Sequence, residues 1–140
     1  MKRLVSVFAG MLLLTFAVLI QTASAQEDAG RLLKQLEDDS DRFSNTVAKA
    51  LDKSRYDGTP AEDDMTRFVR AFEDSIDRLK EAYEKGNDTL ELAKAVQTRA
   101  KAIDKFLKKN ADVGGNTMTD WGTVKAVLLR IKATKMIKTT

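Results

Sequence analysis

The side chains that could do chemistry in this chain are mainly carboxylates, because the sequence contains neither histidine nor cysteine. These absences exclude a Ser-His-Asp triad, a cysteine nucleophile, and His- or Cys-based zinc, haem and di-metal sites. Two acidic runs remain, at residues 37–41 and 62–64. Clustered carboxylates could hold a hard cation or act as paired acids in hydrolysis. Charge runs on helices usually face water, so we predict no catalytic residue, no metal site, no cofactor and no enzymatic activity.

A second group of candidate residues lies toward the C-terminus. Trp121 follows a glycine-rich linker, and Lys125, Lys132 and Lys135 come after it. Tryptophan is enriched at interface hot spots, and lysines offer charge to an anionic partner. We therefore predict Trp121, Lys125, Lys132 and Lys135 as partner-binding residues. The alternative for Trp121 is a core residue that closes one end of the fold.

Charge is segregated along the chain. Residues 26–91 contain 18 acidic and 11 basic residues, a net charge of −7, whereas residues 92–140 contain 3 and 11, a net charge of +8. Either the two halves neutralise each other inside the fold, or the basic half offers a surface to an anionic partner. Lys125 and Lys132 share one side of a helix but Arg130 lies opposite, which disfavours a helix lying on a membrane.

The first 25 residues are typical of an export signal. A basic pair, Lys2 and Arg3, precedes an uncharged apolar stretch at residues 4–20, and Ala23-Ser24-Ala25 provides the small residues of a cleavage site. The apolar stretch is shorter than the ~20 residues that usually span a bilayer. We therefore predict a removed signal peptide at residues 1–25, and a helix over residues 4–20 would belong to that signal.

Cleavage would leave residues 26–140 as a single domain. Its 22 basic and 21 acidic residues nearly balance, and no basic patch is interleaved with aromatic residues. This composition gives no reason to expect nucleic acid as a partner. We also expect no stable membrane span after cleavage. Without cysteine, the domain must be stabilised by its core alone.

Apolar residues recur at steps of three and four in four segments, which predicts amphipathic helices. The segments are 28–54, 60–85, a third that begins near 87–89 and ends around 110, and a last one with Thr117 or Thr119 as its N-cap. Thr59, Pro60 and Glu62 form a capping-box pattern at the second start. In the last segment Leu129 and Met136 lie off the main stripe and form a second, partly apolar edge. We predict an all-α fold, a small antiparallel up-down bundle of about four helices.

These features favour a small exported protein, periplasmic or extracellular, that acts as a non-enzymatic interaction or structural module of the cell envelope. Its partner would be an envelope protein or an anionic surface polymer. The alternative is a binding protein for a small apolar ligand held between the helices, near Phe68, Phe72, Tyr83 and Trp121. A cavity of ligand size at these rings would distinguish the two.

Overall fold

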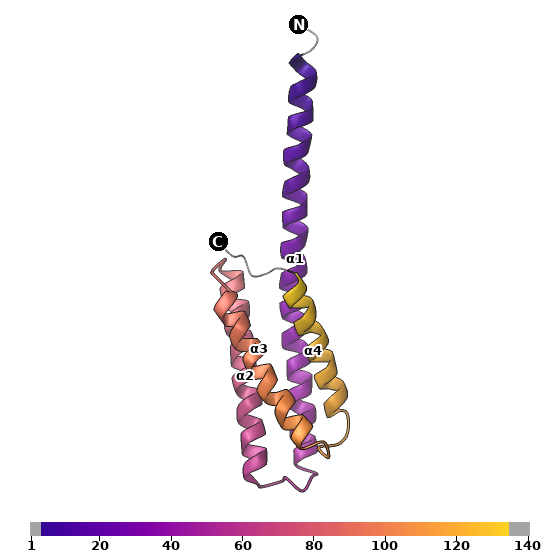
Figure 1. The fold of residues 1–140 in the computed structure, drawn as a ribbon, viewed down its shortest axis with the longest axis vertical. Helices are drawn as coiled ribbons and strands as arrows, with labels where there is room; N and C mark the ends of the chain where they lie inside the picture. The colour runs from indigo at the N-terminus through magenta and orange to yellow at the C-terminus, as the bar shows by residue number, and fades with distance from the viewer. Residues whose placement is uncertain (1–3, 135–140) are drawn as a thin grey trace.

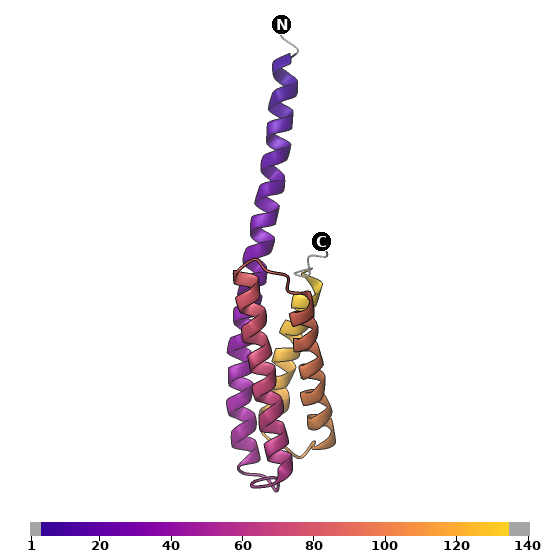
Figure 2. The ribbon, with the colours of Figure 1, turned by 90° about the vertical axis from the view of Figure 1, so that its left-hand side faces the viewer.

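Four helices form the described part of the chain, which in this computed structural model comprises the backbone of residues 4–134 and the side chains of residues 28–134. The helices are α1 (Leu4–Leu51), α2 (Pro60–Glu84), α3 (Leu90–Lys109) and α4 (Thr117–Ala133). Consecutive helices run in opposite directions (Figures 1 and 2). The predicted all-α bundle is therefore confirmed.

The helices form a closed ring in which the contacts between neighbours are unequal. α1 packs most closely against α4, and α2 packs closely against α3, whereas α3 and α4 make the least contact. Figure 2 shows the α1–α2 pair on one side of the bundle and the α3–α4 pair on the other. The weak α3–α4 junction is where the bundle leaves a groove.

Helix α1 is much longer than its partners. Both views show its first part extending past the ends of the other three helices (Figures 1 and 2). The predicted cleavage point before Gln26 lies within this continuous helix, and the first buried side chain among those described is Ala29. Side chains of residues 4–20 lie outside the described set, so the export signal stays a prediction. Among the described residues, no helix has the length and apolar character needed to cross a membrane.

The start of α2 corrects one local prediction. Thr59 is the N-cap and Pro60 the first helical residue, as expected, but the Thr59 hydroxyl makes no capping hydrogen bond. It donates instead to the Tyr56 carbonyl at 2.6 Å, and Glu62 Oε2 accepts from the Gly58 N–H at 2.7 Å. Gly58 has φ of 68°, which only glycine adopts readily. The capping box is therefore shifted by one residue.

One polar position interrupts the apolar stripe of α1. Leu33, Leu36, Phe43 and Val47 are buried as predicted, and Ser40, between them, is 1% exposed. Neither Ser40 Oγ nor Oδ2 of the adjacent buried Asp39 has a hydrogen-bond partner. A buried polar atom without a partner lowers stability, so this point of the core is not optimised for folding.

Candidate binding face on helices 3 and 4

The groove between α3 and α4 is lined by apolar side chains with charged groups around them. Its volume is about 220 Å³. The residues that line it are Gln97, Ala100, Lys101, Asp104, Trp121, Lys125, Leu128 and Leu129. They come from two helices that approach each other only loosely, which leaves this seam open to solvent.

Asp104 joins the two sides of the groove. Its carboxylate accepts from Lys125 Nζ at 3.0 Å and Trp121 Nε1 at 3.3 Å across the seam, and it pairs with Lys108 Nζ at 2.6 Å within α3. Hydrogen bonds from Lys108 and Lys125 lower the pKa of Asp104 from 3.8 to about 2. One carboxylate faces two ammonium groups, so the cluster keeps a net positive charge.

Trp121 lies in the core and not on the surface. Its side chain is fully buried, with ring centroids 4.9 Å from Phe43 and 5.7 Å from Phe72. The indole N–H is satisfied by Asp104. This burial leaves Trp121 unable to serve as an exposed anchor for a partner, and the core role suggested as its alternative accounts for its contacts.

The three predicted lysines have different surroundings. Lys125 is half-buried and engaged by Asp104. Lys132 is exposed and forms no ion pair with any described residue. Lys135 lies outside the described residues. On α3, Lys101 and Lys105 are exposed and also without an ion pair in the described region. Lys101 borders the groove, and it was not singled out from the sequence because its position beside α4 depends on the tertiary fold.

The ion pairs do not neutralise the segregated charge. Among the described residues, no carboxylate of α1 or α2 pairs with a cation of α3 or α4. Lys80 pairs with Glu37 within the acidic half at 2.6 Å. Within the described part of the chain, two pairs join the two halves: Glu91 with Lys94 at 2.7 Å, which lies within α3, and Arg55 with Asp112 at 2.8 Å, in which the acidic half supplies the cation. The basic charge of α3 and α4 is therefore left on their own surface.

The outer side of α4 carries the two large apolar side chains that are exposed among the described residues. Leu129 is 68% exposed and Met118 is 48% exposed. They belong to an exposed uncharged stripe with a spacing of three and four residues: Met118, Gly122, Ala126, Leu129 and Ala133. We call this stripe, with Lys101, Lys125, Arg130 and Lys132 beside it, the α3–α4 face. The second apolar edge predicted at Leu129 is thus exposed, whereas Met136 lies outside the described residues.

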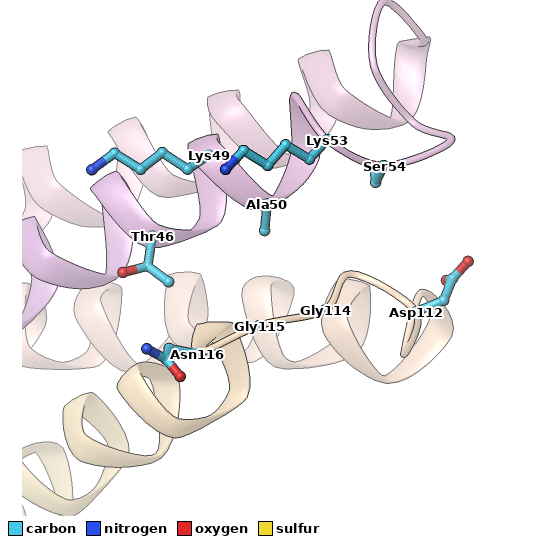
Figure 3. Close-up of a pocket in the computed structure, with 9 residues that line it drawn as sticks. All are labelled: Thr46, Lys49, Ala50, Lys53, Ser54, Asp112, Gly114, Gly115 and Asn116. Atoms are coloured by element: carbon cyan, nitrogen blue, oxygen red, sulfur yellow. The ribbon is translucent and has the colours of Figure 1, made fainter.

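A second pocket, of about 490 Å³, lies at the other end of the bundle between the last turns of α1 and the loop before α4. Figure 3 shows Lys49 and Lys53 on the α1 side and Asn116 on the opposite side. Asp112, at its edge, accepts from Tyr56 Oη at 2.7 Å. Hydrogen bonding by Tyr56 and the charge of Arg55 lower the pKa of Asp112. This cluster ties the α1–α2 turn to the α3–α4 turn.

The aromatic residues predicted to hold an apolar ligand do not enclose a common space. Phe72 packs edge-on against Trp121, and Phe68 packs against Phe106 with ring centroids 6.4 Å apart. Tyr83 lies at another level, beside Gly30 of α1. Of these residues, only Trp121 borders either of the two pockets described above.

Acids of both runs have individual cationic partners. Glu37 pairs with Lys80, Asp38 with Lys34, and Asp64 with Arg67. Within the described residues, no three carboxylates converge closely enough to hold a metal ion. These acids form separate pairs within α1, within α2 and between α1 and α2, and no common site among the described residues.

The geometry thus brings together a groove, an exposed apolar stripe and a set of cations on one side of the bundle. No protein-family model matches this chain, and no curated protein or solved structure shows significant similarity to it.

Proposed function

We propose that this protein is an exported, non-enzymatic interaction module of the cell envelope, which binds an anionic partner through the α3–α4 face. The export signal predicted in residues 1–25 supplies the compartment. The partner would be an acidic protein or an anionic surface polymer. The residue types in the sequence fit binding better than catalysis, because the chain has neither histidine nor cysteine and binding needs neither.

The observation that carries this proposal is the unneutralised charge beside an exposed apolar stripe. Three acids follow residue 91, and each already has a partner: Asp104 with two lysines, Asp112 with Arg55, and Asp120 with Thr46. Lys101 and Lys132 therefore have no carboxylate of their own in the described region. Cations placed around an apolar patch favour association with an anionic surface and accelerate encounter with it.

The test compares two double charge reversals that alter net charge equally. Lys101→Glu with Lys132→Glu changes the α3–α4 face, and Arg70→Glu with Arg78→Glu changes α2, where both arginines are exposed and lack an ion pair among the described residues. We expect the first pair to release the protein from washed envelopes at lower salt and the second to leave retention unchanged. Equal retention of both variants would contradict the assignment of the face.

The predicted export can be tested independently of partner binding. Mass spectrometry of the protein recovered from the envelope fraction is expected to give a chain that begins at Gln26. A chain that keeps residues 1–25 would show that the segment serves as an anchor instead.

Binding of a small apolar ligand is a second candidate, favoured by the groove of about 220 Å³ beside Trp121. This volume lies below the ~300–1,000 Å³ typical of ligand pockets, so we rank it lower. Trp121 is the only tryptophan in the chain, and its fluorescence reports on the groove directly. Titration with a fatty acid that shifts this emission and raises Tm would support the second candidate.

A further inference from the structure

We propose that the partner of the α3–α4 face is an acidic amphipathic helix, which packs lengthwise along the outer side of α4. This inference rests on the proposed function and names the chemistry of the partner. The docking surface for this helix is the exposed stripe from Met118 to Ala133, which continues at Leu129 into the groove between α3 and α4. A stripe with steps of three and four residues matches the spacing of a second helix laid beside it.

Gly122 is the first observation that favours a helix. Glycine is among the poorest helix formers, and Gly122 lies inside α4 without a positive φ that would require it. A Cβ added at Gly122 would meet no atom within 4 Å, so packing within this chain does not require it either. A glycine beside an alanine row permits the backbone of another helix to approach closely.

The cations beside the stripe indicate that the partner is acidic. Lys132 lies along one edge of the stripe with Lys125, which Asp104 engages, and α4 contains no acid after Asp120. Arg130 lies along the other edge and donates to Gln35 Oε1 of α1 at 3.3 Å. Lys101 adds a cation across the groove. Lys101 and Lys132 have no ion pair among the described residues, so a helix with carboxylates flanking its own apolar stripe would pair with them while burying Leu129 and Met118.

The same charges argue against a second copy of this chain. In a two-fold pair, each α4 would place its cations against those of the other α4. The other helices offer no alternative apolar docking surface, because Met118 and Leu129 are the only exposed large apolar side chains among the described residues. A bilayer also fits poorly, since helices that lie on membranes insert bulky apolar residues, and three of the five stripe positions here are glycine or alanine.

The experiment uses the full chain as it accumulates in its export host and a synthetic peptide as the probe. The peptide is helical, carries leucine and alanine at every third or fourth position, and has glutamate on both flanks. Binding is followed by fluorescence anisotropy of a label on the peptide. The same peptide with lysine in place of glutamate is the control ligand, and we expect it not to bind.

The decisive variant is Gly122→Leu, compared with Ala48→Leu on the exposed side of α1. We expect Gly122→Leu to raise Tm, because leucine favours helix over glycine, yet to weaken binding of the acidic peptide by about tenfold or more. Ala48→Leu should leave binding unchanged. Lys101→Glu with Lys132→Glu should also weaken binding, and added salt should do the same.

Three other outcomes would overturn the inference. Equal binding by wild type and Gly122→Leu would exclude close helix packing. Binding to vesicles of phosphatidylcholine and phosphatidylglycerol, stronger in Gly122→Leu and without peptide binding, would identify an anionic lipid surface as the partner. The α3–α4 face would then stand as the binding surface, but the acidic helix would not. Binding to neither peptide nor vesicles, together with unaltered envelope retention of the charge-reversed protein, would overturn both proposals.

Discussion

Asp104 is the residue on which the α3–α4 seam depends. It accepts hydrogen bonds from Trp121 and Lys125 across the seam and pairs with Lys108 on its own helix. Because α3 and α4 otherwise make little contact, these bonds hold the groove at its present width. The same carboxylate also keeps the buried indole N–H of Trp121 satisfied, which a buried donor requires.

We predict that Asp104→Asn lowers the free energy of unfolding by about 1 kcal/mol at pH 7. The folded-state pKa of about 2 lies below the usual value of 3.8. The carboxylate therefore stabilises the fold above about pH 4, and this contribution is lost as pH falls from 4 to 2. Urea denaturation between pH 4 and 2 should show that the free energy of unfolding falls less with acid in the variant than in the wild type.

The control for this prediction is Glu91→Gln, because Glu91 pairs with Lys94 on an exposed helix surface. Exposed ion pairs add little to stability, so the free energy of unfolding of Glu91→Gln should depend on pH as that of the wild type does. An Asp104→Asn variant whose stability falls with acid as steeply as the wild type would contradict the role given to Asp104.

Ser40 gives a second prediction, because its side chain is buried and its hydroxyl has no hydrogen-bond partner. Ser40→Ala removes this group and adds helix propensity, so we expect the free energy of unfolding to rise by about 1 kcal/mol. Ser75→Ala is the matched control: Ser75 is equally buried in a helix, but its hydroxyl donates to the Phe72 carbonyl at 2.6 Å. Thermal denaturation should show a gain for Ser40→Ala and none for Ser75→Ala.

At the scale of elements, periodicity predicted the helices well and their ends less well. α2 and α3 fall within one to three residues of the predicted segments, because their apolar stripes are regular and turns with glycine follow them. The capping partners were misplaced because they depend on loop conformation: the φ of Gly58 directs its N–H to Glu62 in place of the N–H of Thr59. The N-cap of α4 was predicted as Thr117 or Thr119, and this was wrong: Asn116 is the N-cap and Thr117 is the first helical residue.

The candidate site was predicted only in part, for a physical reason. Apolar spacing alone indicated that α4 has a second edge at Leu129, and this edge is exposed. The groove requires the pairing of α3 with α4 in three dimensions, which no pattern within one helix specifies. For the same reason Trp121, a candidate anchor by residue type, belongs to the core, and Lys101 and Asp104 were not singled out.

The start of α2 gives a prediction at the same scale. Glu62 accepts the Gly58 N–H and also lies near the positive end of the helix dipole. We expect Glu62→Ala to lower the free energy of unfolding by about 1 kcal/mol, as loss of a cap does. Asp63→Ala should lower the free energy of unfolding less, because the Asp63 side chain lies in the same turn but is exposed and makes no hydrogen bond among the described residues. Equal losses in the two variants would indicate that both carboxylates act through the helix dipole alone.

At the scale of the whole molecule, the bundle separates charge between its two sides. α1 and α2 lie together on one side and carry most of the acids, whereas α3 and α4 lie on the other and carry most of the unpaired cations (Figure 2). Ion pairs within each helix pair leave this separation intact. A molecule built in this way has a large dipole although the net charge of residues 26–140 is only +1.

This separation predicts that the exported protein is retained at pH 7 and low salt by both a cation exchanger and an anion exchanger. A near-neutral protein with evenly mixed charge would pass through both, since surface charges beyond roughly 10 Å are screened at 0.1 M salt. Lys101→Glu with Lys132→Glu should elute earlier from the cation exchanger than Arg70→Glu with Arg78→Glu, although both variants have the same net charge. Co-elution of the two variants would mean that net charge governs retention and that the α3–α4 face is not a distinct basic surface.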